Sequence, residues 1–147
     1  SSDLAGAMAV GASQQKVALM RRFGEAVGMA FQIQDDILDY TRTAHTGKPA
    51  NNDLREGKIT LPLLAVLDKA PAERRTELLG RLACCHDDEE SVEYLQRTVE
   101  NEGGLTFAAE VMRSYIARAV EMLSEYEASD YRTALANLCA YIAERDR

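Results

Sequence analysis

Several residue types are scarce in this sequence, and each shortage narrows the classes of protein to which it can belong. Its 147 residues include no tryptophan, 3 prolines, 9 glycines, 3 cysteines and 2 histidines. Because proline and glycine are the residues that interrupt helices, long helices are allowed. The cysteines, Cys84, Cys85 and Cys139, are odd in number and show no Cys-x-x-Cys spacing. We therefore expect reduced, buried thiols in a cytoplasmic protein.

Long apolar runs and an excess of basic residues are also absent. No stretch of about 18 apolar residues occurs, which argues against a transmembrane segment, and no signal peptide is visible. The formal net charge is -7, and no basic stripe with interleaved aromatic residues occurs, which argues against a nucleic-acid partner. The remaining composition, with 46% hydrophobic and 28% charged residues, is ordinary for a globular domain. A chain of this length can bury the core of one domain.

Apolar residues recur at helical spacing along most of the chain, and no segment alternates in the way that strands do. We expect an all-α protein, in which roughly six or seven helices pack as an antiparallel bundle within a single domain over residues 1–147. Expected helices cover about residues 1–11, 13–43, 59–69 and 105–127, others begin near Pro71, Asp87 and Ser129, and residues 44–57 form a loop. Because the first residue is not Met and the chain opens directly into an apolar pattern, we expect it to begin partway through a larger protein.

The most informative stretch is an apolar helix that carries three aspartates near its end, at Asp35, Asp36 and Asp39. At about 100° per residue, these three residues and Gln32 share an arc of roughly a quarter of the helix circumference. Gly24 and Gly28 fall beneath the carboxylates, which predicts either a close neighbouring helix or room for a ligand. We expect the bulky apolar residues on the opposite side, namely Phe23, Phe31, Ile33, Ile37 and Leu38.

The three aspartates favour a site for a hard divalent cation, because two carboxylates can share an ion while the third reaches another ion or orients the first two. Like charges at this spacing repel one another unless a cation is present. We therefore predict that Asp35, Asp36 and Asp39 bind Mg²⁺, the alternative being a solvated acidic face. A second acidic run, Asp87–Glu90, stands at an expected helix start, where acids complement the helix dipole, and we assign it a structural role.

The loop after this helix carries two lysines, Lys48 and Lys58, on either side of Asp53. Because lysine binds phosphate as a point charge, we predict that they neutralise a metal-bound diphosphate, while Asp53 orients a lysine or a metal-bound water. Gln32, one turn before Asp36, can donate to a phosphate or offer its carbonyl oxygen to a cation. The alternatives are two exposed loop lysines and an ordinary amide on the helix surface.

These motifs, taken together, are more specific than a lone Asp-Asp-x-x-Asp. They are Phe23-Gly24, Gly28-x-Ala30-Phe31-Gln32-Ile33-x-Asp35-Asp36-x-x-Asp39-Tyr40, Gly47-Lys48-Pro49, Asp53-Leu54, Gly57-Lys58-x-Thr60-Leu61-Pro62 and Tyr131-Arg132-x-x-Leu135-x-x-Leu138-x-x-Tyr141. In this order they resemble the second aspartate-rich region and last helix of trans-isoprenyl diphosphate synthases. The resemblance covers essentially the whole chain, and it is closest to the polyprenyl synthases that make quinone side chains.

The resemblance implies an all-α fold around a central cavity and a homodimer. It also implies a Mg²⁺-dependent prenyltransferase reaction, in which isopentenyl diphosphate condenses with an allylic diphosphate. By matching position, it implies Mg²⁺ ligands at Asp35, Asp36 and Asp39, substrate contacts at Gln32, Lys48, Asp53 and Lys58, and catalytic roles for Gln32 and Lys58.

The sequence also departs from the family, whose members are much longer and carry another aspartate-rich motif and most of the isopentenyl diphosphate site in their first half. We interpret the chain as the C-terminal half of a polyprenyl diphosphate synthase, and we expect no synthase activity from it alone. The alternatives are a non-catalytic helical subunit or interaction module of a heteromeric synthase, a terpene cyclase, or an acidic bundle without a ligand. The intact aspartate motif favours the enzyme, and the two lysine segments fit a cyclase poorly.

Overall fold

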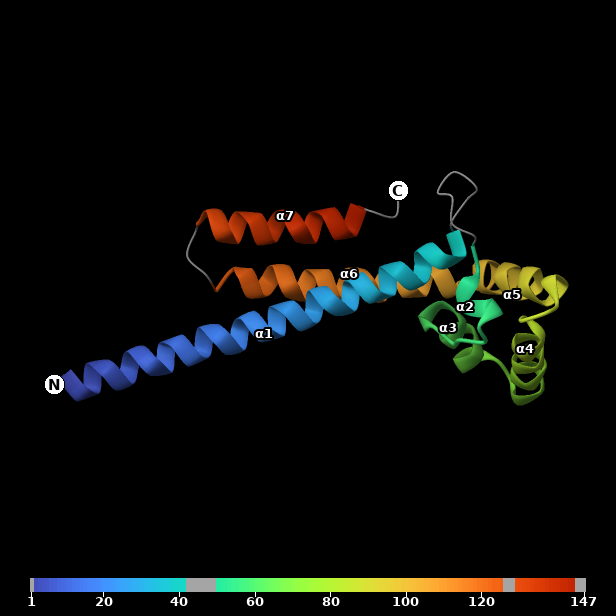
Figure 1. Ribbon diagram of the computed structural model, residues 1–147, viewed down its shortest axis with the longest axis horizontal. Coiled ribbons are helices and arrows are strands. Elements are labelled where there is room, and N and C mark those ends of the chain that lie inside the picture. Colours follow the sequence, from blue (N-terminus) through green and yellow to red (C-terminus); the bar gives the residue numbers. More distant parts are fainter. Residues whose placement is uncertain (1, 42–49, 126–128, 145–147) are drawn as a thin grey trace. The chain divides into compact units, whose positions relative to one another are not determined.

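The protein is described by a computed structural model, which covers residues 2–41, 50–125 and 129–144. These residues form seven α-helices and no strand, which confirms the all-α prediction (Figure 1). Within this part of the chain, no helix is both long enough and apolar enough to cross a lipid bilayer. The helices are α1 (Ser2–Thr41), α2 (Asn52–Arg55), α3 (Leu61–Lys69), α4 (Ala72–Cys84), α5 (Glu89–Asn101), α6 (Gly104–Leu123) and α7 (Asp130–Glu144).

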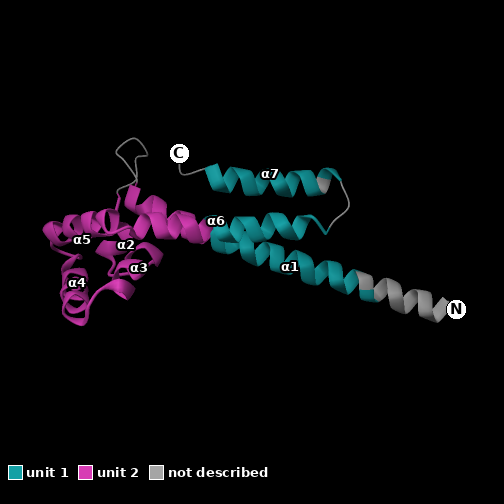
Figure 2. Ribbon diagram, turned by 180° about the vertical axis from the view of Figure 1, so that it is seen from behind, with its two compact units in different colours: residues 1–31, 113–145, 147 teal, residues 32–112, 146 magenta. Residues whose placement is uncertain are grey.

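The chain falls into two compact units, and α1 and α6 each run through both of them (Figure 2). Of the described residues, unit 1 holds α1 as far as Phe31 and those from Arg113 to Glu144, and unit 2 holds those from Gln32 to Met112. Within unit 1, α1 buries one apolar stripe at Leu19, Phe23, Ala26 and Ala30. The described residues of the predicted site belong to unit 2.

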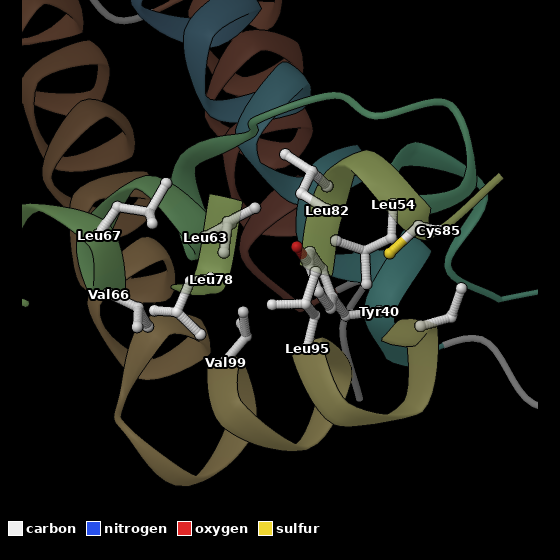
Figure 3. Packing of buried hydrophobic residues seen from close by; sticks show 11 residues of the cluster. Tyr40, Leu54, Leu63, Val66, Leu67, Leu78, Leu82, Cys85, Leu95 and Val99 are labelled. Carbon is white, nitrogen blue, oxygen red and sulfur yellow. The ribbon is translucent and has the colours of Figure 1, made fainter. Parts of the chain in front are cut away.

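Unit 2 is built on a hydrophobic core to which α1 through α5 all contribute (Figure 3). α5 is central to this unit, since it packs against α2, α3 and α4. Val92, Leu95 and Val99 recur at helical spacing, so they line one face of α5, and each is at most 1% exposed. Tyr40 brings the last turn of α1 into the same core. The other members are Leu54 from α2, Leu63, Val66 and Leu67 from α3, Leu78 and Leu82 from α4, and Cys85.

Two segments differ from the expected helix boundaries. A single helix, α1, replaces the two helices expected over residues 1–11 and 13–43, and Ser13 is an exposed residue inside it. The glycine at position 11 costs a helix only about 1 kcal/mol, and without a proline nearby the helix continues. The expected loop over residues 44–57 contains a helical turn, α2, because Leu54 is fully buried in the core of unit 2.

Other local features agree with the sequence analysis. Ser129 Oγ accepts the backbone N–H of Arg132 at 3.1 Å, so Ser129 caps α7, a helix that is expected to begin near this residue. Pro62 lies in the first turn of α3, where a missing N–H is tolerated. Of the three thiols, Cys85 and Cys139 are buried as expected, whereas Cys84 is exposed and corrects that expectation.

The start of α6 meets the start of α3 at a contact that only glycine allows. A Cβ at Gly104 would overlap the carbonyl oxygen of Pro62 and would lie 3.0 Å from Val99 Cγ1. The preceding Gly103 has φ of 82°, a left-handed conformation that favours glycine. The glycine pair that follows α5, Gly103 and Gly104, therefore also holds the start of α3 in place. The residues around Lys58, called the Lys58 segment below, come directly before α3.

Candidate functional site

The last turns of α1 present Gln32, Asp35 and Asp36 on unit 2. Gln32 is exposed, both aspartates are half-buried, and the Gln32 side-chain amide donates a hydrogen bond to Asp36 Oδ1 at 3.1 Å. Burial raises the pKa of the Asp36 carboxyl, the hydrogen bond from Gln32 opposes this rise, and the charges of Asp35 and Asp39 add to it. The same negative charges would attract a cation to this position.

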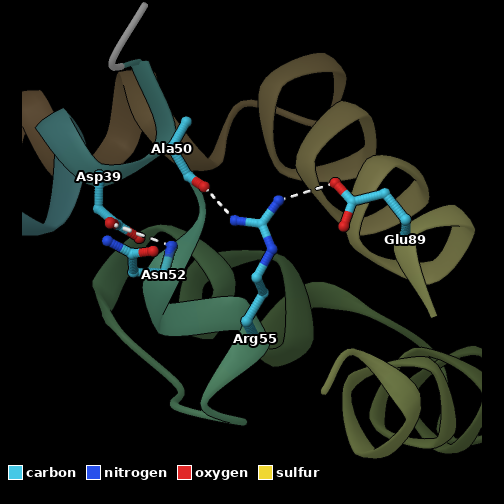
Figure 4. Close-up of polar contacts among 5 residues, drawn as sticks. All are labelled: Asp39, Ala50, Asn52, Arg55 and Glu89. Carbon is cyan, nitrogen blue, oxygen red and sulfur yellow. Dashed lines mark hydrogen bonds and ion pairs between the residues drawn. The ribbon is translucent and has the colours of Figure 1, made fainter. Parts of the chain in front are cut away.

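Asp39 has different surroundings, because its carboxylate holds the start of α2 (Figure 4). Asp39 is only 5% exposed. Its Oδ1 accepts the backbone N–H of Asn52 at 3.2 Å, and its Oδ2 accepts that of Asp53 at 3.0 Å. Its backbone carbonyl also accepts the N–H of Asn51 at 2.7 Å. Asn51 is left-handed, with φ of 64°, and makes no side-chain cap, so Asp39 supplies acceptors for the first N–H groups of α2.

Lys58 is positioned by the turn that follows α2. Its backbone N–H donates to the carbonyl oxygen of Asp53 at 2.8 Å. Its Nζ lies 2.7 Å from Glu56 Oε2, and this hydrogen bond raises the pKa of Lys58. Burial raises the pKa of Asp53, two carboxylates of α1 add to the rise, and Lys58 opposes it. Asp53 and Lys58 therefore belong to the same electrostatic cluster as the carboxylates of α1.

Tyr40 anchors the end of α1 by packing. It is 3% exposed and belongs to the core of unit 2. Burial raises the pKa of Tyr40 far above its ordinary value, the Thr60 hydroxyl opposes this only in part, and the nearby carboxylates add to it. The phenol therefore stays neutral. Because Tyr40 is anchored in the core, its neighbour in sequence, Asp39, is held at the point where α1 meets that core.

One predicted position is outside the described residues, and another is wrong. Lys48 is not among the described residues, so its contact with a diphosphate stays a prediction. Phe31 is 42% exposed, whereas Phe23 and Ile33 are each 3% exposed, so Phe31 is not on the buried side as expected. The physical reason is that Phe31 precedes Asp35 by four residues, and such residues share one face of a helix.

The two glycines of α1 have open space beside them. A Cβ added at Gly24 or Gly28 would meet no described atom within 4 Å beyond the helix itself. Among the described residues, a close neighbouring helix is therefore not what requires glycine here. The other expected reason, room for a ligand, stays a prediction.

Arg55 belongs to the site, although the sequence analysis does not single it out. Its guanidinium donates to the carbonyl oxygen of Ala50 and, from Nη2, to Glu89 Oε1 at 2.7 Å (Figure 4). Arg55 thereby ties the backbone before α2 to the first turn of α5. The sequence signal that could have indicated Arg55 is Glu89, an acidic residue that can pair with a basic one. In the same acidic run, Asp88 Oδ2 accepts a hydrogen bond from Ser91 Oγ at 2.6 Å, which supports the structural role predicted for the run.

The donor chemistry of the site fits one mode of binding Mg²⁺. Among the described residues, no three His, Cys, Asp or Glu side chains converge in a geometry that holds a metal ion. Asp35 and Asp36 nevertheless offer two half-buried carboxylates. Mg²⁺ is commonly bound by one or two carboxylates together with phosphate oxygens of a substrate. The residues therefore fit a cation that is shared with a bound diphosphate, rather than a cage made by the protein alone.

Comparison with known proteins decides the family. The family model described as polyprenyl synthetase matches residues 2–101, which is more than half of the chain and includes α1 through α5. The chain belongs to the polyprenyl synthetase family. The resemblance predicted from the motifs is confirmed, and the polyprenyl synthetase match includes both the carboxylates of α1 and the Lys58 segment.

Three proteins illustrate how this polyprenyl synthetase chain compares with others. A short chain isoprenyl diphosphate synthase of Methanothermobacter thermautotrophicus is 35% identical over 143 residues, which are 97% of this chain and 43% of that protein. Heptaprenyl diphosphate synthase component 2 of Geobacillus stearothermophilus is 33% identical over 142 residues, which are 96% of this chain and 43% of that protein. The crystal structure of a polyprenyl synthase from Caulobacter crescentus CB15, complexed with calcium and isoprenyl diphosphate, matches with a TM-score of 0.75 and 31% identity.

The match extends over only part of each relative. The Caulobacter comparison covers 87% of this chain and 40% of the other. The chain therefore spans about two fifths of the length of the polyprenyl synthetase relatives that it matches.

Proposed function

We propose that this chain provides the diphosphate-binding part of a polyprenyl diphosphate synthase, an enzyme of isoprenoid and quinone side-chain biosynthesis. The reaction condenses isopentenyl diphosphate with an allylic diphosphate. The observation that carries the proposal is the single electrostatic cluster formed by Asp35, Asp36, Asp53 and Lys58 on unit 2. Burial raises the pKa values of Asp36 and Asp53, nearby carboxylates add to the rise, and a bound cation would oppose it.

Asp35 and Asp36 are the carboxylates best placed to hold Mg²⁺, because both are half-buried, whereas Asp39 is only 5% exposed. Asp39, the third predicted ligand, lies one turn further along the same helix. When bound, Mg²⁺ would neutralise charge on the diphosphate that leaves the allylic substrate. The protein holds its carboxylates on a rigid helix, so the position of that charge is set before substrate arrives.

The remaining predicted residues act on the anion. Lys58 offers an exposed ammonium next to the acidic cluster, and Lys48 is proposed to contact the same diphosphate. The Lys58 ammonium would exchange Glu56 for phosphate oxygens when the anion binds. Gln32 is exposed and already aligned on Asp36, so its amide can donate to a phosphate oxygen or line the reaction centre.

We also propose that the chain is part of a longer prenyltransferase, that it works in the cytoplasm, and that it forms a homodimer. The support for the first point is that the chain spans only 43% of relatives such as the Methanothermobacter synthase. On its own the chain is proposed to lack synthase activity, because the sequence contains one aspartate-rich motif rather than two. Polyprenyl product made by this chain alone would contradict that.

A second candidate is a subunit of a heteromeric prenyl synthase. The relative from Geobacillus stearothermophilus is named as component 2 of a heptaprenyl diphosphate synthase. A subunit that lacked catalytic residues would not need the diphosphate site. The complete set of α1 carboxylates therefore favours the enzyme part over a purely structural subunit.

Isothermal titration calorimetry with inorganic diphosphate at saturating Mg²⁺ tests the proposal directly. The wild-type chain is expected to bind, and Asp35→Ala is expected to abolish binding. Asp87→Asn is the matched control, since it removes an exposed acid before α5 and should change affinity by less than about twofold. Absence of binding by the wild type, or unchanged binding by Asp35→Ala, contradicts the proposed site.

A further inference from the structure

We infer that Asp39 is a positioning residue, which holds α2 and through it Lys58, rather than a ligand of Mg²⁺. The inference deepens the proposed function and rests on it, because Lys58 matters only if an anion binds. It departs from the pattern of three equivalent aspartates, in which Asp35, Asp36 and Asp39 would serve the same ion.

Both carboxylate oxygens of Asp39 already serve as hydrogen-bond acceptors. Oδ1 accepts the N–H of Asn52 at 3.2 Å, and Oδ2 accepts the N–H of Asp53 at 3.0 Å. Both donors are peptide groups whose positive ends point at the carboxylate. A cation bound by the same oxygens would be attracted by them but would repel the positive ends of the two N–H dipoles. At 5% exposure, Asp39 also presents little surface to an ion arriving from solvent.

The helical turn α2 needs an external partner. A helix of four residues is too short to be stable by itself, and its N-cap Asn51 makes no side-chain cap. Leu54 anchors α2, since it is fully buried in the core of unit 2. Asp39 adds two charge-assisted hydrogen bonds at the start of α2, and such bonds are stronger than neutral ones.

Two hydrogen bonds lead from Asp39 to Lys58. The N–H of Asp53 donates to Asp39, and the carbonyl oxygen of Asp53 accepts the N–H of Lys58 at 2.8 Å. One residue therefore links the two, through its two peptide groups. If Asp39 released Asp53, the backbone of Lys58 would lose its fixed distance from the α1 carboxylates.

Amide hydrogen exchange of the wild-type chain and two variants, measured by NMR, separates the two roles. Asp39→Asn keeps the size of the side chain but replaces one acceptor oxygen by an amide group. The exchange rates of the Asn52 and Asp53 amides are expected to rise at least about tenfold in this variant. Asp36→Asn is the matched control, because it neutralises a neighbouring acid whose carboxylate accepts the side-chain amide of Gln32, and it should leave those two rates within about twofold.

Calorimetry then measures Mg²⁺ binding and diphosphate binding separately. A general loss of stability would weaken both, whereas the positioning role predicts different effects on the two. With Mg²⁺ alone as the probe, Asp39→Asn is expected to weaken binding no more than about threefold, through the loss of one nearby charge, whereas Asp36→Asn weakens it at least about tenfold. With inorganic diphosphate at saturating Mg²⁺, Asp39→Asn is expected to weaken binding at least about tenfold, because Lys58 is no longer held. Equal loss of Mg²⁺ affinity in the two variants, with unchanged amide exchange in Asp39→Asn, overturns the inference.

A measurement on the unmodified chain covers the case in which Asp39→Asn does not fold. The Asn52 and Asp53 amides are followed with and without saturating Mg²⁺. Unchanged or slower exchange supports the positioning role, and faster exchange, from a carboxylate that leaves them for the metal, overturns it. If the wild type binds neither Mg²⁺ nor diphosphate, the proposed function fails, while the exchange rates in Asp39→Asn still decide whether this side chain holds α2.

Discussion

Two acidic clusters of this chain meet opposite electrostatic conditions. Glu89 and Glu90 lie in the first turn of α5, where the helix dipole favours negative charge. Asp35, Asp36 and Asp39 lie near the C-terminal end of α1, where the dipole opposes it. The first cluster has structural partners in Arg55 and Ser91. In the second cluster, burial and the charges of Asp35 and Asp39 raise the pKa of the Asp36 carboxyl. A cation bound as proposed above would offset this clustered negative charge.

Binding of Mg²⁺ gives the largest expected difference between the clusters. Saturation at about 100 times the dissociation constant should stabilise the wild-type chain by about 2.7 kcal/mol, because the ion binds the folded state. Asp35→Asn should remove this gain, and Asp87→Asn should keep it. Urea unfolding with and without Mg²⁺ measures the gain, and a loss in both variants would make the clusters equivalent.

Arg55 links the backbone before α2 to Glu89 of the first cluster. Its removal should therefore have the next largest effect on the free energy of unfolding. Arg55→Ala deletes the bond to the carbonyl of Ala50 and the pair with Glu89, and should destabilise the chain by about 2 kcal/mol. Arg97→Ala, at an exposed position of α5, is the control and should cost less than about 0.5 kcal/mol. Urea unfolding decides, and equal costs would show that the Arg55 contacts contribute nothing special.

Neutralising one acid in each cluster should change stability in opposite directions. Without Mg²⁺, Asp36→Asn should stabilise the chain by about 0.5 kcal/mol, since it removes repulsion from Asp35 and Asp39. Glu90→Gln should destabilise it by about 0.5 kcal/mol, since it removes a charge that the α5 dipole favours. Chemical denaturation at low ionic strength measures both changes. Changes of the same sign would break the comparison.

The smallest expected effect is the pH dependence of stability. The pKa values of Asp36 and Asp53 are raised in the folded chain, so the folded state binds protons more readily than the unfolded state. Their contribution to stability is therefore present at low pH and is lost as pH rises from the unfolded pKa through the folded one. Between about pH 4 and pH 7, unfolding should become easier in the metal-free wild type and less so in Asp36→Asn. A flat difference between the two proteins would contradict this.

The sequence predicts the parts of the structure that depend on local periodicity. The core face of α5, at Val92, Leu95 and Val99, follows from helical spacing, and the start of α7 near Ser129 is also predicted. The acidic arc of α1 is likewise a matter of spacing along one helix. These features need no knowledge of what lies across the fold.

The parts that the sequence does not predict depend on contacts between distant residues. Asp39 meets the N–H groups of residues 13 and 14 positions later, and Arg55 meets an acid 34 positions later. No periodic pattern records such pairs. The turn α2 is missed for the same reason, because it is held by Asp39 and by burial of Leu54 rather than by its own helix propensity. Phe31 shows a different error, since spacing alone places it with Asp35.

The contact of Gly104 with Pro62 has a mechanical consequence for the Lys58 segment. The C-terminal end of this segment is fixed, because the backbone of α6 at Gly104 packs closely against the first turn of α3. The upstream end passes through Gly57, which is exposed, has φ of 71° and has no described atom near its missing Cβ. Gly57 is nevertheless held, because its backbone N–H donates to the carbonyl oxygen of Leu54 at 3.0 Å and the N–H of Lys58 donates to that of Asp53 at 2.8 Å. With the backbone fixed on both sides of Lys58, only the exposed Lys58 side chain would need to turn from Glu56 toward an anion.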